Sequence, residues 1–101
     1  KSLKKYNPKN KYFFSSIKPN HKSFEEKRYW RGPVWINCNW IIYQGLKNKD
    51  KNFAKKVKKQ TIDLVKKKGF HEYYSCKTGE GFGANNFSWT ASLFLDLMLE
   101  R

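Results

Sequence analysis

The Gly-rich segment Phe70–Phe87, FHEYYSCKTGEGFGANNF, holds the two carboxylates whose surroundings best suit acid–base chemistry. Glu72 precedes two tyrosines, and Glu80 lies in a Gly-Glu-Gly sequence. A carboxylate held among rings in a loop between packed helices can act as a general base. A carboxylate in such a place can equally accept hydrogen bonds from nearby backbone N–H groups. The residues alone leave both roles of Glu72 open.

The other acidic residues fit an exposed surface or a helix cap. Asp50 stands where a helix should begin, and we expect it to cap that helix. The remaining five lie on polar stretches or on helices: Glu25, Glu26, Asp63, Asp96 and Glu100. The chain has no Cys-x-x-Cys pair and no paired histidines, the usual ligands of structural zinc. We therefore expect no metal and no cofactor.

A second stretch with chemical potential runs from Arg28 to Trp40, with the sequence RYWRGPVWINCNW. Its indole faces can stack on the apolar C–H faces of a sugar ring, and its Arg and Asn side chains can hydrogen-bond the hydroxyls. The start of the following helix adds unpaired backbone N–H groups. We expect Trp30 and Arg31 to be site residues, and Trp40 to belong to the helix core.

Three helices must position these two stretches. Pro33 favours the first turn of a helix over Val34–Gln44, with Gly45 as the stop, and its apolar residues cover nearly the whole circumference. Such a helix must be enclosed by neighbours, so we expect the isolated chain to be aggregation-prone or poorly folded. We expect the segment before it, from residue 1 to about 27, to be extended or a long loop.

The second and third helices are predicted over Asp50–Lys68 and from Trp89 to about Glu100. The second has one apolar stripe, lysines on its other side, and Gly69 at its end, so it should lie on the outside. Asn86 or Ser88 is expected to cap the third. Four of its residues should form a buried stripe: Leu93, Phe94, Leu97 and Met98. The pattern indicates a layered helical array, and no strand is expected between the helices.

The formal net charge of +14 is typical of proteins that bind nucleic acid or anionic surfaces. However, only three of the 22 basic residues are arginine, the side chain that most often contacts phosphates and bases. Lysine accompanies many asparagines here, which indicates a compositional bias. We therefore do not expect nucleic-acid binding. The hydrophobic content of 39% excludes a compositionally disordered chain.

Neither a membrane span nor a targeting segment is visible. The apolar run Leu93–Leu99 is interrupted by Asp96 and is far shorter than the roughly 20 residues that cross a bilayer. Cys38 and Cys76 are expected to be free thiols, which fits a cytoplasmic protein better than a secreted one.

Two motifs, YWRGPVWINCNW and GFHEYYSCKTGEGFGANNFSWTASLFLDL, resemble the C-terminal end of inverting glycoside hydrolases of family 63. The resemblance covers roughly Tyr12 to Leu99 and is strongest to the branch around mannosylglycerate hydrolase and glucosidase I. It implies an all-α fold, the C-terminal portion of an (α/α)6 barrel. It also implies that Glu72 is the catalytic base. By the same resemblance the residues that line or support the sugar pocket would be Tyr29, Trp30, Arg31, Trp35, Tyr73 and Trp89, with Glu80 matching a less certain position.

The resemblance further implies that residues 1–101 form one segment of a larger catalytic domain. The family's proton donor, an aspartic acid, lies upstream of the matched region, so this chain would hold half of the catalytic pair. The expected reaction is inverting hydrolysis of an α-linked glucoside or mannosyl compound, with the rest of the barrel upstream as partner. The alternative is a non-enzymatic basic helical module that binds nucleic acid or an acidic partner.

Overall fold

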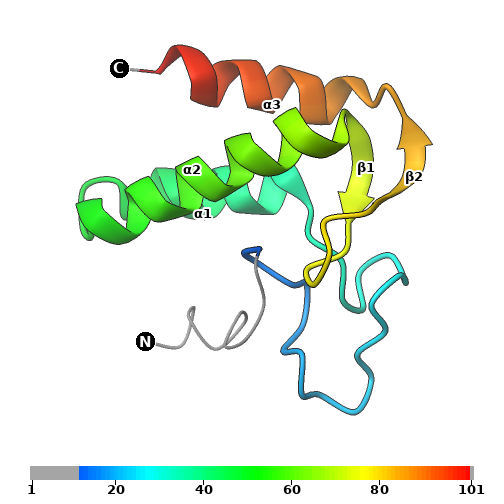
Figure 1. The fold of residues 1–101 in the computed structure, drawn as a ribbon. Coiled ribbons are helices and arrows are strands. Elements are labelled where there is room, and N and C mark those ends of the chain that lie inside the picture. Colours follow the sequence, from blue (N-terminus) through cyan, green and yellow to red (C-terminus); the bar gives the residue numbers. More distant parts are fainter. Residues whose placement is uncertain (1–11, 101) are drawn as a thin grey trace.

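The computed structural model describes residues 12–100, and the part of the expected extended segment before Tyr12 lies outside them. Each of three helices contacts the other two, and a two-stranded hairpin closes one end of the layer (Figure 1). The chain from Tyr12 to Trp35 forms loops beside the hairpin. The elements are α1 (Ile36–Leu46), α2 (Lys51–Lys68), β1 (His71–Tyr74), β2 (Gly81–Asn85) and α3 (Ser88–Leu99).

Helix α2 follows its prediction closely. Asp50 caps it, because its side chain accepts a hydrogen bond of 3.1 Å from the Phe53 N–H. Gly69 ends it with a φ of +92°, a conformation that favours glycine. The predicted apolar stripe is the buried face: Phe53, Ala54, Val57, Thr61, Leu64 and Val65. The one-sided character of this helix is therefore confirmed.

The prediction for α1 was wrong at both ends. The helix begins at Ile36, because Val34 is extended and exchanges two backbone hydrogen bonds with Tyr74, of 2.7 and 2.9 Å. Pro33 therefore precedes the helix. At the other end the helix continues through Gly45 to Leu46. Pairing with a strand that is distant in sequence decided the start, which local helix signals do not encode.

The segment between α2 and α3 was predicted as a loop without strands, and this was also wrong. Strands β1 and β2 pair in antiparallel fashion, with Tyr73 opposite Phe82 and His71 opposite Asn85. Glycines at alternate positions of β2 hide the strand pattern, because glycine has low strand propensity. The described fold is thus mostly helical with one small sheet, rather than purely helical.

Helix α3 begins at Ser88, one residue before its prediction, and ends at Leu99. The predicted cap was wrong: Phe87 occupies the cap position and no side chain caps the helix. Leu97 is buried as predicted and Leu93 and Phe94 are half-buried, whereas Met98 is exposed. The Thr90 hydroxyl donates to the His71 carbonyl oxygen at 2.8 Å and joins the first turn of α3 to β1.

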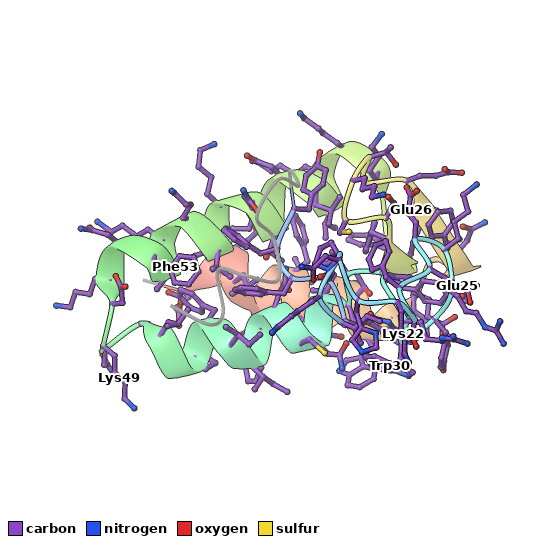
Figure 2. All side chains as sticks on the ribbon, turned by 90° about the horizontal axis from the view of Figure 1, so that it is seen from below. Lys22, Glu25, Glu26, Trp30, Lys49 and Phe53 are labelled. Atoms are coloured by element: carbon purple, nitrogen blue, oxygen red, sulfur yellow. The ribbon has the colours of Figure 1, made fainter. Side chains whose placement is uncertain are left out.

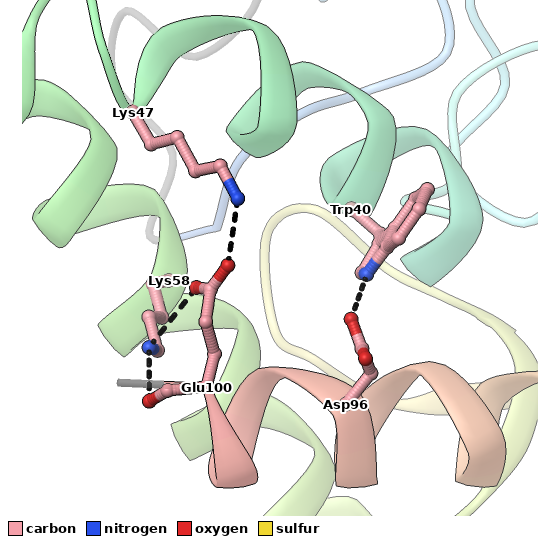
Figure 3. A network of polar contacts seen from close by, with 5 residues as sticks. All are labelled: Trp40, Lys47, Lys58, Asp96 and Glu100. Atoms are coloured by element: carbon pink, nitrogen blue, oxygen red, sulfur yellow. Dashed lines mark hydrogen bonds and ion pairs between the residues drawn. The ribbon is translucent and has the colours of Figure 1, made fainter.

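A polar network joins the C-terminal ends of α1 and α3 to the middle of α2 (Figure 3). The Glu100 carboxylate pairs with Lys47 at 2.9 Å and with Lys58 at 3.4 Å. Contact with the Tyr43 hydroxyl, followed by the bonds to these lysines, lowers the pKa of Glu100 to about 2. The carboxylate therefore stays charged and holds the end of α3 against both other helices, although its sequence suggested a simple surface position.

The core consists of two apolar clusters, one between the helices and one where Val34 and β1 meet α2. Cys38 and Cys76 are thiols that form no disulfide, as expected. No helix between Tyr12 and Glu100 is both long and apolar enough to cross a membrane. Within the same span no three His, Cys, Asp or Glu side chains gather so that they could hold a metal ion.

Candidate functional site

Four rings meet beside the hairpin and form what we term the aromatic cluster: Tyr29, Trp30, Trp35 and Tyr73. Trp30 stacks on Trp35 with ring centroids 3.8 Å apart and planes 8° from parallel. Trp35 in turn lies against Tyr73 at 5.0 Å, and Tyr29 approaches it edge-on, also at 5.0 Å. Trp35 is only 3% exposed, whereas Trp30 is 42% exposed. One indole thus supports another that faces outward.

Local backbone geometry fixes the cluster. Tyr29 has a φ of +42°, which is uncommon for a residue with a side chain. Its carbonyl oxygen accepts a 2.9 Å hydrogen bond from the Trp35 indole N–H. This bond holds the loop that carries Tyr29 and Trp30 over the residue that precedes α1. Strained residues of this kind are often found at binding sites.

A second connection joins the same loop to the end of β1. The Ser75 hydroxyl is fully buried and accepts hydrogen bonds from the N–H groups of Lys77 and Thr78, both at 3.1 Å. Its own proton is donated to the Glu26 carboxylate at 2.5 Å. Figure 2 shows Glu26 and Trp30 at the end of the molecule opposite Lys49. Glu26 therefore anchors the loop of the aromatic cluster to the hairpin, a role that the sequence did not reveal.

The Glu72 side chain lies against the backbone of β2, close to the aromatic cluster. One of its oxygens, Oε1, accepts a 3.2 Å hydrogen bond from the Ala84 N–H. A side-chain carbon built on Gly83 would lie 2.6 Å from this oxygen and 2.9 Å from the edge of the Tyr73 ring. The carboxylate therefore lies near the ring of Tyr73, which contacts Trp35 and Tyr29. Of the two roles left open for Glu72, backbone hydrogen bonding is present, and it leaves the other oxygen for chemistry.

Three predicted site residues lie outside this arrangement. The Arg31 guanidinium bonds the Ser23 carbonyl oxygen at 3.3 Å and pairs with Glu25 at 3.5 Å, so it is held within its own loop. Trp89 is 51% exposed at the start of α3, and in the described chain it makes no ring contact with the aromatic cluster. Glu80 is exposed in the β1–β2 connection, where its backbone, rather than its side chain, bonds Ser75 and Thr78.

Trp40 was predicted to belong to the core and is half-buried against it. Its indole N–H donates to Asp96 on α3 at 2.7 Å (Figure 3). Phe82, which sequence reasoning did not single out, extends the aromatic surface: its ring lies 6.2 Å from Tyr73, and the Lys27 ammonium lies 5.8 Å above it. Its position directly opposite Tyr73 could have been found only by predicting the hairpin.

Residues 2–90 match the model of the mannosylglycerate hydrolase MGH1-like glycoside hydrolase domain. The chain belongs to this family. It is 42% identical over 94 residues to the mannosylglycerate hydrolase of Thermus thermophilus, and 44% identical over 85 residues to mannosylglycerate hydrolase MGH1 of Selaginella moellendorffii. These alignments cover 90% and 83% of this chain, respectively. The resemblance to this branch of family 63 is thereby confirmed.

A solved structure shows the same arrangement of elements. The fold matches the crystal structure of a family 63 mannosylglycerate hydrolase from Thermus thermophilus in complex with Tris and D-glycerate, with a TM-score of 0.86 at 38% identity. The match covers 93% of this chain and 24% of that structure. The chain also spans 22% of the Thermus thermophilus relative and 17% of the Selaginella relative. Most of each relative thus has no counterpart in the 101 residues.

Proposed function

We propose that this chain forms the C-terminal part of an (α/α)6 barrel that hydrolyses an α-linked sugar with inversion. The observation that carries the proposal is the approach of the Glu72 carboxylate to a stack of rings whose outermost indole is exposed. A sugar ring that lies against such rings can present its anomeric carbon to a water molecule near a carboxylate. The names of the relatives favour mannosyl- or glucosylglycerate as substrate.

The reaction divides between two carboxyl groups. Glu72 accepts a proton from water while the water oxygen bonds to the anomeric carbon and the glycosidic bond breaks. The leaving oxygen takes a proton from a carboxylic acid that the proposed upstream part of the barrel supplies. Inversion requires a separation of about 6.5–9.5 Å between these groups, so that one water fits between them. Tyr29, Trp30 and Tyr73 would hold the sugar while Trp35 supports them from below.

The apolar surface of the helices supports the presence of further barrel helices. Ile41 on α1 is 61% exposed, and Leu95 and Leu99 on α3 are exposed to similar or greater extents. Helices α1 and α3 contact each other, and large apolar side chains exposed on both are consistent with a surface that other protein covers. In the proposed barrel these side chains pack against helices that precede the 101 residues.

The test replaces Glu72 by Gln in the complete polypeptide, meaning this chain joined to the rest of its barrel. The same test applies to a chimera in which the 101 residues replace the matching segment of the Thermus thermophilus enzyme. We expect kcat for mannosylglycerate to fall about 1,000-fold with KM nearly unchanged, because the amide cannot accept the proton from water. Asp63→Asn is the matched control, since that carboxylate lies on α2, where it pairs with Lys59 at 3.0 Å, and it should retain activity.

Wild-type activity of the Glu72→Gln variant would contradict the proposal. The alternative, a basic module, would then be tested by neutralising the exposed lysines Lys55, Lys56 and Lys59 on α2. That function predicts weaker binding of an anionic partner and a steep dependence on salt. These lysines are on the outer side of α2 and leave the aromatic cluster untouched, so the two experiments are independent.

A further inference from the structure

We propose that Gly83 and Ala84 are positioning residues for Glu72, which hold one carboxylate oxygen so that the other takes the proton. The inference rests on the proposed function of Glu72 as the base. It means that the register shift between β1 and β2 orients the carboxylate that takes the proton. Neither residue touches the substrate in this scheme, so both act through Glu72.

The pairing of β1 and β2 is irregular at Glu72. His71 pairs with Asn85 and Tyr73 pairs with Phe82, so Glu72 alone faces the two residues Gly83 and Ala84. This two-against-one arrangement is a β-bulge, and Gly83 has the positive φ of +75° that such bulges often require. The bulge turns the Ala84 N–H toward the Glu72 side chain, to which it donates. Bulges next to active sites commonly redirect a side chain in this way.

The absence of a side chain at Gly83 leaves room for Glu72. A carbon atom added there would lie 2.6 Å from Oε1 of Glu72 and 2.8 Å from its Cβ. Both distances are well inside van der Waals contact. Oε1 is the far end of a flexible side chain and can move aside, whereas Cβ is attached to the backbone; the added carbon would also lie 2.9 Å from the edge of the Tyr73 ring. The carboxylate therefore rests on the bare backbone of Gly83, and any larger residue would move it.

The hydrogen bonding distinguishes the two oxygens of Glu72. Oε1 is bonded to the Ala84 N–H, whereas among residues 12–100 no protein group donates to Oε2. Oε2 is therefore the oxygen available to a water molecule. Because the donor on Oε1 belongs to the backbone of a paired strand, it cannot rotate away as a side chain could. The carboxylate is thus oriented before the substrate binds, which lowers the cost of reaching the reactive geometry.

The experiment is a double-mutant cycle between Gly83→Ala and Glu72→Gln in the complete polypeptide, with kcat and KM for mannosylglycerate as the readout. We expect Gly83→Ala to lower kcat about 100-fold, the effect expected when a reacting group is displaced by about 1 Å. KM should rise modestly, because the added carbon also lies 2.9 Å from the Tyr73 ring. In the Glu72→Gln background the same change should lower kcat less than twofold, because the oriented group is already inactive. Gly45→Ala is the matched control, since nothing lies within 4 Å of the added carbon, and it should leave kcat unchanged.

Equal losses of kcat in both backgrounds would overturn the inference, because they would indicate a general structural role for Gly83. An unchanged kcat in Gly83→Ala would also overturn it. If Gly83→Ala does not fold, Ala84→Pro replaces the N–H donor by a ring carbon that also displaces the Glu72 carboxylate, and the same cycle applies. Failure of the proposed function is separate, because it would show as full activity of Glu72→Gln alone.

Discussion

The two ends of the helical layer use their polar groups in opposite ways. At the far end, Glu100 commits both carboxylate oxygens to Lys47 and Lys58, and Asp96 bonds Trp40 (Figure 3). At the hairpin end, Glu72 keeps one oxygen without a protein donor among the described residues, and Trp30 keeps an exposed ring. The first end is built to hold helices together, whereas the second retains unused bonding capacity that a ligand can satisfy.

The largest effect on the hairpin end is expected from Trp35→Ala. Trp35 is buried between Trp30 and Tyr73, so its removal should lower the free energy of unfolding by about 3–5 kcal/mol. Trp30→Ala is the matched control, because the same ring type is removed from a half-exposed place. It should cost less stability and instead raise KM. Urea unfolding of the complete polypeptide measures the stability of both variants, and steady-state kinetics measure KM. Equal losses of stability would contradict the supporting role of Trp35.

A smaller effect is expected when the anchor between Glu26 and Ser75 is removed. Glu26→Ala leaves the buried Ser75 hydroxyl without its acceptor, which should cost about 1–3 kcal/mol of stability and raise KM by loosening the loop that carries Trp30. Glu26→Gln keeps an acceptor oxygen at the same place and should restore most of both. The comparison is made by thermal unfolding and steady-state kinetics. Identical behaviour of the two variants would show that the charge, rather than the hydrogen bond, matters.

The smallest effect concerns pH at the far end. Because the pKa of Glu100 is lowered to about 2 from an ordinary value of 4.5, its contribution is fully present above pH 4.5 and is lost as the pH falls toward 2. The ion pairs are partly exposed, so the loss should be about 1 kcal/mol after allowance for solvent screening. The difference between wild type and Glu100→Gln in urea unfolding, measured at about pH 6 and about pH 3, tests this. A difference that does not shrink at the lower pH would contradict it.

The sequence predicted those parts of the fold that depend on short-range patterns. Helix α2 has a capping aspartate, a stripe at helical spacing and a terminal glycine, all within 20 residues, and its bounds were accurate to one residue. The start of α1 was missed because Val34 pairs with Tyr74, which is 40 residues away. The hairpin was missed because Gly81 and Gly83, of which Gly83 lies in the bulge, remove the alternation that marks a strand.

The candidate site was predicted to a similar extent. Tyr29, Trp30, Trp35 and Tyr73 come together in the structure, and Glu72 lies beside them. Arg31 and Trp89 do not join the cluster, since the first pairs with Glu25 and the second faces outward. The residues that hold the loop of the aromatic cluster in place, Glu26 and Ser75, could not be predicted from the sequence. Glu26 and Ser75 are 49 positions apart, and neither has an unusual neighbourhood in the sequence.

The bulge in β2 has a consequence for which substitutions the chain can tolerate. Gly83 matters because it lacks a side chain, so a saturation library selected for activity should return glycine at this position almost alone. Ala84, its neighbour, is exposed and contributes only its N–H, so the same library should return nearly every amino acid there except proline. Two adjacent positions that both orient Glu72 would thus differ in the substitutions they accept. Gly83 is restricted by the volume of its side chain, whereas Ala84 is restricted only by the need for a backbone N–H.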